Sequence, residues 1–568
     1  MADQDFLWDV QVPMRDGVNL AANIYFPKGD APFPVLLNRT PYVKDSALRA
    51  KRVKPYVKAG YAVVHMDVRG RGNSEGAFDP YFQEIKDGYD SLQWAGTQQW
   101  SNGKVGTYGG SYEGWTQIFP MRLQSKYHKA AFLMCTPSMH PFHDNNTYWA
   151  GVPSPIMAIW SLFTSGKMNK EQTNELDWET VLNHRPLRDL MKHLGVASSF
   201  LDRHYEHETF DDFYKRLWPN DNVVNLTKTP CYFVTGWFDD SLKGTLDHFP
   251  ALAMHHPDAE VRKQQKLLIG PWPHRLSTDS SKLGDFDYGP QSIVPLEKEA
   301  IRWFDYWLKG IDNGIVDEPR VRVFLMGSNR WIETDTFPIT ECKTRVLLLA
   351  ADGPANTLSG KGRLAETHGT SSTSEFTYNP KRPAPTPFWK ENFQNGANED
   401  LRYIQRRDDV LVFTSDPLNK PLNVVGMLSA ELFVSTSATD TDFVTRLSDV
   451  SHDGYSQRLN AGIFRLRYRE GYEKIKLIKP NEIVKITVDM WATGHQFQIG
   501  HCVRLEVTSS GFPTWAPNYN TGGSVWDEVE PIVARQIVYH SPQYPSRLLL
   551  PELPSPNLVN AWPETRWA

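Results

Sequence analysis

A serine between glycines is the feature of this chain that points most directly to chemistry. Ser111 lies in the segment Val105–Trp115, after a strand-like run and before a helical stretch. Such a strand-to-helix turn lifts a serine hydroxyl clear of a sheet, and it needs glycines because the two backbones approach too closely for a Cβ. The general pattern has glycine two residues after the serine, whereas here Glu113 stands there and Gly114 follows. An ordinary glycine-rich turn therefore stays open as the alternative.

A serine nucleophile needs a base to take its proton and a carboxylate to orient that base. For serines on such turns, the chain order is serine, acid, histidine, each on a loop after a strand. The apolar run Cys231–Thr235 leads into Asp239, and the run Lys266–Ile269 leads into His274. Either loop alone is a weak indication, since acids after strands are often turn formers and a lone histidine is often structural. Together they predict Ser111 as nucleophile, His274 as general base and Asp239 as the orienting acid.

An acyl-transfer site also needs donors for the developing oxyanion. The backbone N–H of Tyr112 is one candidate, because it opens the helix that follows the serine. The second donor is expected in the loop after the third strand, which reads Asn38-Arg-Thr-Pro-Tyr42 and offers a phenol instead of a run of glycine amides. Tyr42 is thus a candidate O–H donor, with a packing tyrosine after a turn proline as the equal alternative.

The elements that must position these residues follow an alternating pattern over the first half of the chain. A hairpin is expected from Val10 to Tyr25 around Arg-Asp-Gly, and helices are expected near Ile85–Gln98 and Glu297–Lys309. Nearly continuous apolar runs are typical of strands buried on both faces of a parallel sheet, which predicts an α/β fold. These runs are Val35–Leu37, Tyr61–Val68, the run ending near Tyr108, Ala130–Cys135, Cys231–Thr235, Lys266–Ile269 and Val321–Met326.

Two further regions differ in character from this sheet. Residues 141–226 read as a helical insertion, which would lie over the carboxyl ends of the strands, where α/β sites open. Beyond about residue 341, short strands alternate apolar and polar side chains, as in Val484–Met490 and Val503–Thr508, which predicts an antiparallel sandwich or jelly roll. The expected domains are 1–140 with 227–340, the insertion 141–226, and the β domain 341–568.

Composition and charge indicate which classes of partner the protein can bind. The net charge of −5 and pI near 6.4 leave no basic surplus for nucleic acid or a membrane surface, so a small-molecule substrate is expected. No run approaches a transmembrane length, and the acidic N-terminus lacks the basic start of a secretory signal, which favours the cytoplasm. The four separate cysteines favour buried thiols. No metal site and no cofactor motif is predicted, since His204-Tyr-Glu-His207 lacks helical ligand spacing and Gly70-Arg-Gly72 lacks the third glycine of a dinucleotide loop.

Seven motifs along the chain carry a resemblance to known proteins: Arg39-Thr-Pro-Tyr42, Asp67-Val-Arg-Gly-Arg-Gly-Asn-Ser-Glu-Gly76, Gly109-Gly-Ser-Tyr-Glu-Gly114, Gly236-Trp-Phe-Asp239, Gly270-Pro-Trp-Pro-His274, Asp440-Thr-Asp-Phe443 and Gly500-His501. With these motifs the chain resembles the cocaine-esterase-like hydrolases, which are related to X-prolyl dipeptidyl peptidases and α-amino acid ester hydrolases. The resemblance covers nearly the whole chain. It implies an α/β-hydrolase domain with a helical cap and a C-terminal jelly roll, the triad Ser111, Asp239 and His274, and an oxyanion hole of the Tyr42 O–H and the Tyr112 N–H. It also accounts for Glu113, and it implies a structural role for the Asp67 motif.

The substrate class follows less directly. The α-amino acid ester hydrolases carry an acidic cluster after the triad aspartate to hold an ammonium group, whereas here Asp239 is followed by Asp240-Ser-Leu-Lys243. A neutral acyl group is therefore expected, with Trp149, Trp160 and Trp237 as candidate walls of an acyl pocket. Ester hydrolysis is the first hypothesis. An amidase, acylase or X-prolyl aminopeptidase on the same triad is the alternative enzyme, a hydrolase fold that only binds is the non-enzyme alternative, and a homo-oligomer is left open.

Overall fold

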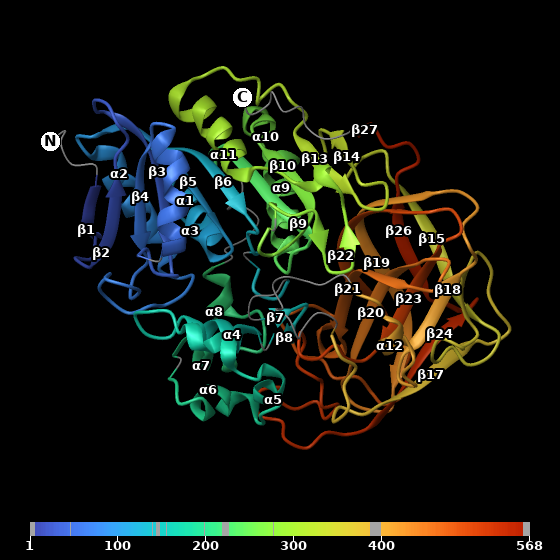
Figure 1. Ribbon diagram of the computed structural model, residues 1–568. Helices are drawn as coiled ribbons and strands as arrows, with labels where there is room; N and C mark the ends of the chain where they lie inside the picture. Colours follow the sequence, from blue (N-terminus) through green and yellow to red (C-terminus); the bar gives the residue numbers. More distant parts are fainter. Residues whose placement is uncertain are drawn as a thin grey trace.

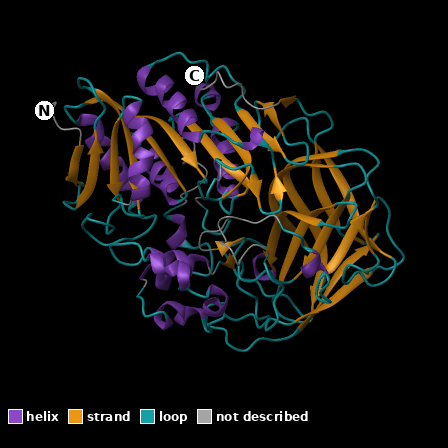
Figure 2. Cartoon of the chain, in the orientation of Figure 1, coloured by secondary structure: helices purple, strands orange, loops and turns teal. Residues whose placement is uncertain are grey.

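The computed structural model describes nine stretches of the chain. They are residues 6–45, 47–138, 140–143, 148–154, 156–197, 199–217, 227–276, 278–386 and 399–559. Two large β-sheets dominate them, one flanked by helices and one in an all-β region (Figures 1 and 2).

The first sheet carries the candidate site. Its 11 strands in the described ranges run in the order β1-β2-β4-β3-β5-β6-β9-β10-β13-β14-β27. The strands from β4 to β13 in that order are parallel, and β1, β2 and β14 extend the sheet by antiparallel pairing. The strands are β1 Phe6–Pro13, β2 Asn19–Tyr25, β3 Phe33–Thr40, β4 Ala62–Asp67, β5 Ser101–Gly110, β6 His128–Met134, β9 Cys231–Phe238, β10 Lys266–Pro273, β13 Val321–Leu325, β14 Arg330–Thr334 and β27 Leu558–Val559.

The apolar runs form the central strands. Helices cover the sheet, so these strands need apolar side chains on both faces. Every residue of β4 and of β10 is buried, as a strand covered on both faces requires. The expected hairpin, strands and helices are confirmed. The helix expected over Glu297–Lys309 is α11, which continues as a π-helical turn over Asp305–Lys309. The covering helices are α1 Ala47–Lys58, α2 Glu84–Thr97, α3 Tyr112–Met121, α9 Leu242–Ala253, α10 Ala259–Lys263 and α11 Leu296–Phe304.

The helical insertion follows β6 and precedes β9 in the chain, and its helices lie below the first sheet in Figure 1. Its Asn169 donates to the backbone oxygen of Tyr42 at 2.9 Å and accepts from Arg71 at 2.7 Å. Arg71 follows β4 and Tyr42 follows β3, so the insertion packs at the carboxyl ends of the strands, as predicted. Its elements are β7 Tyr148–Trp149, β8 Val152–Pro153, α4 Ile156–Phe163, α5 Trp178–Leu182, α6 Leu190–His193, α7 Ser199–Tyr205 and α8 Asp212–Lys215.

The all-β region has its own apolar core and mainly antiparallel pairing, with β16 and β18 as a parallel pair. The alternation predicted for Val484–Met490 is confirmed, since Ile486, Val488 and Met490 are buried while Lys485 and Thr487 are exposed. The strands are β15 Lys343–Ala351, β16 Gly362–Ala365, β17 Thr373–Tyr378, β18 Leu411–Ser415, β19 Leu422–Thr436, β20 Asp442–Val450, β21 Ser456–Arg465, β22 Val484–Phe497, β23 Cys502–Thr508, β24 Ala534–Ser541, β25 Tyr544–Pro545 and β26 Arg547–Glu552.

The two sheets are joined by main-chain contacts. Met326, just after β13, donates to the Gly494 oxygen at 2.9 Å and accepts from the Gln496 N–H at 2.8 Å. The sequence predicts a β domain that extends to residue 568, whereas Leu558–Val559 pairs with β14 as an edge strand of the first sheet, and residues 560–568 lie outside the described residues. Over its described part, the chain therefore crosses between the domains twice, and the domain bounds otherwise stay a prediction.

Buried ion pairs fix the all-β region beside the insertion. Arg465 makes a two-bond contact with Asp442, each bond 2.8 Å long, and Arg467 contacts Asp440 at 2.6 Å. Asn518 donates to both carboxylates at 2.9 Å. The Asp440-Thr-Asp-Phe443 motif is therefore a structural ionic cluster.

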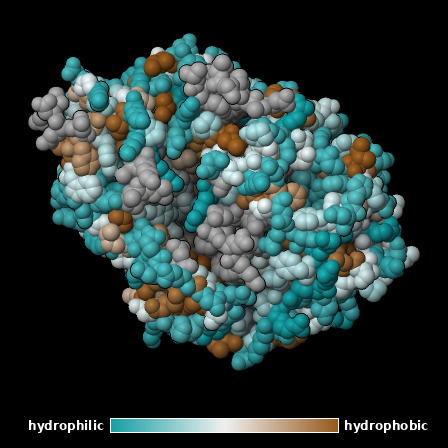
Figure 3. Space-filling model, viewed as in Figure 1, coloured by the Kyte–Doolittle hydropathy of each residue, from teal (hydrophilic) through white to brown (hydrophobic). Residues whose placement is uncertain are grey.

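The surface is mostly polar. Figure 3 shows one face, on which hydrophobic side chains form small separate groups within a mainly hydrophilic surface. Within the described ranges, no helix combines the length and apolar composition that crossing a bilayer requires.

We expect Asp442→Ala to destabilise the protein strongly. The side chains of Asp442 and Arg465 are both 1% exposed, so the substitution leaves a buried guanidinium without its partner, at a cost of about 3–5 kcal/mol. Lys381→Ala is the control, because the Lys381–Glu530 pair is exposed to solvent and should contribute nothing measurable. Thermal unfolding midpoints measure both, and equal midpoints for the two variants would contradict the structural role of the cluster.

Candidate active site

Ser111 occupies a strained turn between β5 and α3. Its φ of 61° and ψ of −127° lie outside the regions that L-residues favour, and its N–H donates to the Met134 oxygen on β6 at 3.0 Å. Such a conformation costs on the order of 1–3 kcal/mol and persists only where neighbouring structure enforces it. The turn places Ser111 just after β5, at the carboxyl ends of the strands, which favours the strand-to-helix turn of a nucleophile over an ordinary glycine-rich turn.

Two close approaches explain the residues around this turn. A Cβ on Gly114 would lie 2.3 Å from the Thr136 hydroxyl oxygen, so glycine is required where the helix starts. The buried carboxylate of Glu113 accepts from Asn38 Nδ2 at 3.1 Å and from the Gly110 N–H at 3.4 Å. Glu113 therefore ties the turn to β3, which is the physical reason for an acid at that position.

The three predicted triad residues meet in one hydrogen-bonded chain. His274 Nε2 lies 2.9 Å from Ser111 Oγ, and His274 Nδ1 lies 2.7 Å from Asp239 Oδ1. The side chain of Asp239 is completely buried and that of His274 is 8% exposed. Three loops, after β5, β9 and β10, deliver these atoms, so the proximity arises from the parallel sheet.

Asp239 is held by donors on both oxygens. Thr235 donates its hydroxyl to Oδ2 at 2.6 Å, and the Ser241 N–H donates to Oδ1 at 2.9 Å. Burial opposes the charge, yet His274 and these hydrogen bonds lower the pKa of Asp239 below its usual value. The carboxylate therefore stays ionised and fixed in orientation.

A second carboxylate reaches the same imidazole nitrogen. Asp240 Oδ1 lies 2.8 Å from His274 Nδ1, and the Asp240 side chain is 18% exposed. Burial lowers the pKa of His274, but the charges of Asp240 and Asp239 outweigh it and raise that pKa well above its ordinary value. This contact was not predicted, although two adjacent aspartates on one loop are a signal for it in the sequence.

The predicted oxyanion donors lie beside Ser111. The Tyr42 hydroxyl accepts from Trp160 Nε1 at 3.3 Å and interacts with the Ser111 side chain. Burial raises the pKa of Tyr42, so its phenol keeps the proton it would donate. Tyr112 opens α3, where a backbone N–H has no intrahelical partner.

The loop that carries Tyr42 is fixed by the Asp67 motif. Asp67 Oδ1 accepts from the Lys44 N–H at 2.7 Å, and Arg71 Nε donates to the Pro41 oxygen at 2.7 Å. This motif therefore acts as structural support, as predicted.

The three predicted pocket tryptophans lie in different surroundings. Trp160 stacks on Tyr112 with ring centres 5.6 Å apart and contacts Tyr42, so it borders the site. Trp149 stacks on Trp491 of the all-β region at 4.0 Å, and Trp515 meets it edge-on, which makes it part of an inter-domain seam.

Trp237 differs from the prediction. It is 1% exposed, donates to the Phe324 oxygen at 2.7 Å, and a Cβ on Gly494 would lie 2.6 Å from its ring. Its side chain is thus enclosed between the two sheets and does not form the wall of an open acyl pocket.

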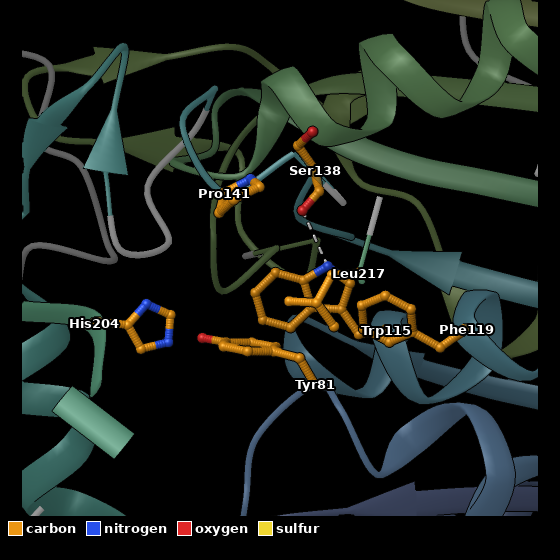
Figure 4. A pocket seen from close by; sticks show the side chains of 7 residues that line it. All are labelled: Tyr81, Trp115, Phe119, Ser138, Pro141, His204 and Leu217. Atoms are coloured by element: carbon orange, nitrogen blue, oxygen red, sulfur yellow. Dashed lines mark hydrogen bonds between the residues drawn. The ribbon is translucent and has the colours of Figure 1, made fainter. Parts of the chain in front are cut away.

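A small pocket lies beside α3 under the insertion (Figure 4). Trp115 Nε1 donates to the Ser138 oxygen at 3.1 Å along one side of it. None of the three predicted tryptophans lines it. Its lining residues are Tyr81, Trp115, Phe119, Ser138, Pro141, His204 and Leu217.

Cys135 completes the environment of the triad. Its Sγ donates to the His274 backbone oxygen at 3.2 Å, and Cys135, Asp239 and His274 offer potential ligand atoms within 4.8 Å of one another. Burial and the nearby Asp239 charge raise the pKa of the Cys135 thiol well above its usual value, so it stays protonated. Both imidazole nitrogens of His274 are already engaged in the triad, which does not fit metal ligation.

Comparison with known proteins agrees with this geometry. A family model described as X-Pro dipeptidyl-peptidase (S15 family) matches residues 16–275, and one described as the X-Pro dipeptidyl-peptidase C-terminal non-catalytic domain matches residues 313–549. The chain is 32% identical to cocaine esterase of Rhodococcus sp. (strain MB1 Bresler), over 96% of this chain and 98% of that protein.

Solved structures give the same result. An α-amino acid ester hydrolase superposes with a TM-score of 0.83 at 26% identity, over 97% of each chain. An aminopeptidase from a marine sediment Thaumarchaeota archaeon has the same fold, with a TM-score of 0.82 at 24% identity over 97% of each chain. The α/β-hydrolase fold with a helical insertion and a C-terminal all-β domain is thus confirmed, and the protein is a serine hydrolase. Within that class, the chain belongs to the cocaine-esterase-like and X-Pro dipeptidyl-peptidase (S15) family.

We expect Gly236→Ala to damage the site without touching a triad residue. Gly236 pairs with Gly270, and its added Cβ would lie 1.9 Å from the Trp272 backbone oxygen, so the two strand ends that carry Asp239 and His274 would move apart. A displacement of about 1 Å typically costs about 10²-fold in rate. The rate of Ser111 labelling by a fluorophosphonate measures the effect.

Gly523→Ala is the control, because its Cβ would meet only side-chain atoms, at 3.2 Å or beyond. Labelling of the Gly236 variant at the control rate would show that the strand spacing does not position the triad.

Proposed function

We propose that this protein hydrolyses carboxylic esters of small, uncharged acyl groups through an acyl-enzyme on Ser111. The observation that carries the proposal is the continuous chain from Ser111 Oγ through His274 to Asp239 Oδ1, with contacts of 2.9 and 2.7 Å. Family membership supports it, since relatives include a cocaine esterase. The proposed substrate is a small molecule.

In the proposed reaction, His274 Nε2 takes the Ser111 proton as Oγ attacks the ester carbonyl. The Tyr42 O–H and the Tyr112 N–H donate to the oxygen that becomes negative. The imidazolium then gives its proton to the departing alcohol oxygen, which leaves the acyl group on Ser111. A water molecule, deprotonated by His274, attacks the acyl-enzyme, and the returning proton releases the acid and restores Ser111.

The preference for an uncharged acyl group rests on the acids near the triad loop. Asp247, on α9, lies 3.0 Å from Lys243 Nζ, and Asp489 approaches the same ammonium at 3.5 Å. Asp240 faces His274. Because these carboxylates already face cationic or protonatable groups, a substrate ammonium would gain little from them.

Amide or X-Pro peptide hydrolysis is the second candidate, and the family model that matches residues 16–275 favours it. Rates on p-nitrophenyl butyrate, butyryl p-nitroanilide and alanyl-prolyl p-nitroanilide separate the two. Faster turnover of the alanyl-prolyl compound would replace the ester proposal. The free state of all four cysteines suits a reducing compartment, and the cytoplasmic location remains part of this proposal.

Ser111→Ala should abolish ester turnover, with a loss of about 10⁴-fold or more, because it removes the hydroxyl that is hydrogen-bonded to the proposed base His274. Release of p-nitrophenol measures the rate, and intact mass after phenylmethylsulfonyl fluoride treatment should give one adduct on wild type and none on the variant. Ser328→Ala is the control, since its hydroxyl only donates to the Leu325 backbone oxygen. Full activity in the Ser111 variant would refute the nucleophile assignment.

Tyr42→Phe should lower kcat by about 10²-fold, equivalent to about 3 kcal/mol, with little change in KM, because the phenol donates mainly to the charge that develops in the transition state. Trp160→Phe is the control, since it removes the 3.3 Å bond to Tyr42 while the phenol remains. An effect confined to KM, or an equal kcat loss in both variants, would assign Tyr42 to packing.

A further inference from the structure

The second carboxylate at the imidazole has no place in a three-residue triad. Asp239 Oδ1 and Asp240 Oδ1 lie 2.7 and 2.8 Å from the same atom, His274 Nδ1. The neutral imidazole that acts as general base carries one proton on Nδ1; Asp239 Oδ1 accepts it, and Asp240 Oδ1 lies nearly as close to the same nitrogen. We propose that Asp240 is a second positioning carboxylate, which holds His274 in its Nδ1-protonated form together with Asp239. This inference rests on the proposed triad chemistry.

The two carboxylates have different surroundings. Asp239 is fully buried and fixed by Thr235 and Ser241, whereas Asp240 is 18% exposed. The Ser241 hydroxyl lies 3.5 Å from Asp240 Oδ1, a long contact. Asp239 is therefore the rigid partner and Asp240 the partly solvated one. Its charge still reaches an imidazole that is almost entirely buried, where screening by water is weak.

Two further titratable groups of the described residues lie near His274, and both are neutral. Cys135, from the loop after β6, contacts its backbone oxygen, and burial raises the pKa of that thiol. Tyr42, from the loop after β3, also keeps its proton because burial raises its pKa. The two aspartates are thus the charged groups that balance the imidazolium formed when Ser111 is deprotonated.

Two consequences follow for catalysis. The imidazolium of the transition state is stabilised by two negative charges, at the cost of a base that stays protonated to higher pH. Asp240 also supplies an acceptor for the Nδ1 proton when Asp239 is changed. In other triads, aspartate-to-asparagine substitution costs about 10⁴-fold because the histidine takes the wrong tautomer. Here the loss for Asp239→Asn should be smaller.

The deciding experiment is NMR titration of His274 in full-length protein labelled at histidine Cε1, with its signal assigned by its absence in His274→Asn. Asp240→Asn removes one negative charge, so the pKa of His274 should fall by roughly 1 unit. Asp240→Glu, which keeps the charge, should stay near wild type. Asp317→Asn, in an exposed loop before β13, is the control for overall charge and should change nothing.

Activity gives the second readout. The base must be neutral, so kcat/KM rises with pH through the pKa of His274, and Asp240→Asn should move this limb to lower pH. Asp239→Asn alone should lose about 10²-fold, and Asp239→Asn with Asp240→Asn about 10⁴-fold, the loss seen when the orienting carboxylate is removed. Equal losses in the single and double variants, with an unchanged His274 titration, would overturn the role of Asp240.

Failure of the ester proposal would look different. Wild type would then show no ester turnover and no adduct on Ser111, whereas the NMR titration would still report whether Asp240 controls the protonation of His274.

Discussion

The structure depends on one imidazole that must reach two partners at once. His274 contacts Ser111 with one nitrogen and Asp239 with the other, at 2.9 and 2.7 Å. These residues come from three separate strands, so the strand ends must hold their spacing to fractions of an ångström. Continuous backbone pairing from β5 through β6 and β9 to β10 meets that requirement, and the close approach of Gly236 to Trp272 shows how little space remains.

The remainder of the molecule stiffens this edge of the sheet. Asp67 and Arg71 hold the loop of Tyr42, and Asn169 links the same loop to the insertion. The insertion is anchored to the all-β domain by the Trp149–Trp491 stack. The β domain therefore supports the site indirectly, because it holds the insertion whose Trp160 borders Ser111.

Burial and nearby charge act in opposite directions on the pKa of His274. A buried histidine resists protonation, and two adjacent carboxylates reverse that tendency. Burial keeps Cys135 and Tyr42 neutral. The negative charge beside the ring therefore lies on the two carboxylates next to Nδ1, while Nε2 faces the Ser111 hydroxyl. Such asymmetry suits a base that becomes positively charged in the transition state.

The sequence by itself determined the order of elements, the elbow around Ser111 and the loops of Asp239 and His274, because glycine requirements and buried apolar runs are local properties that leave local patterns. It did not determine where Trp237 points, that Trp149 stacks on Trp491, that β27 returns to the first sheet, or that Asp240 shares the imidazole nitrogen. Those outcomes depend on strand register, loop conformation and the docking of distant segments. Register, loop conformation and docking set the directions of side chains only once the chain has packed. Tertiary structure alone therefore decided these four outcomes.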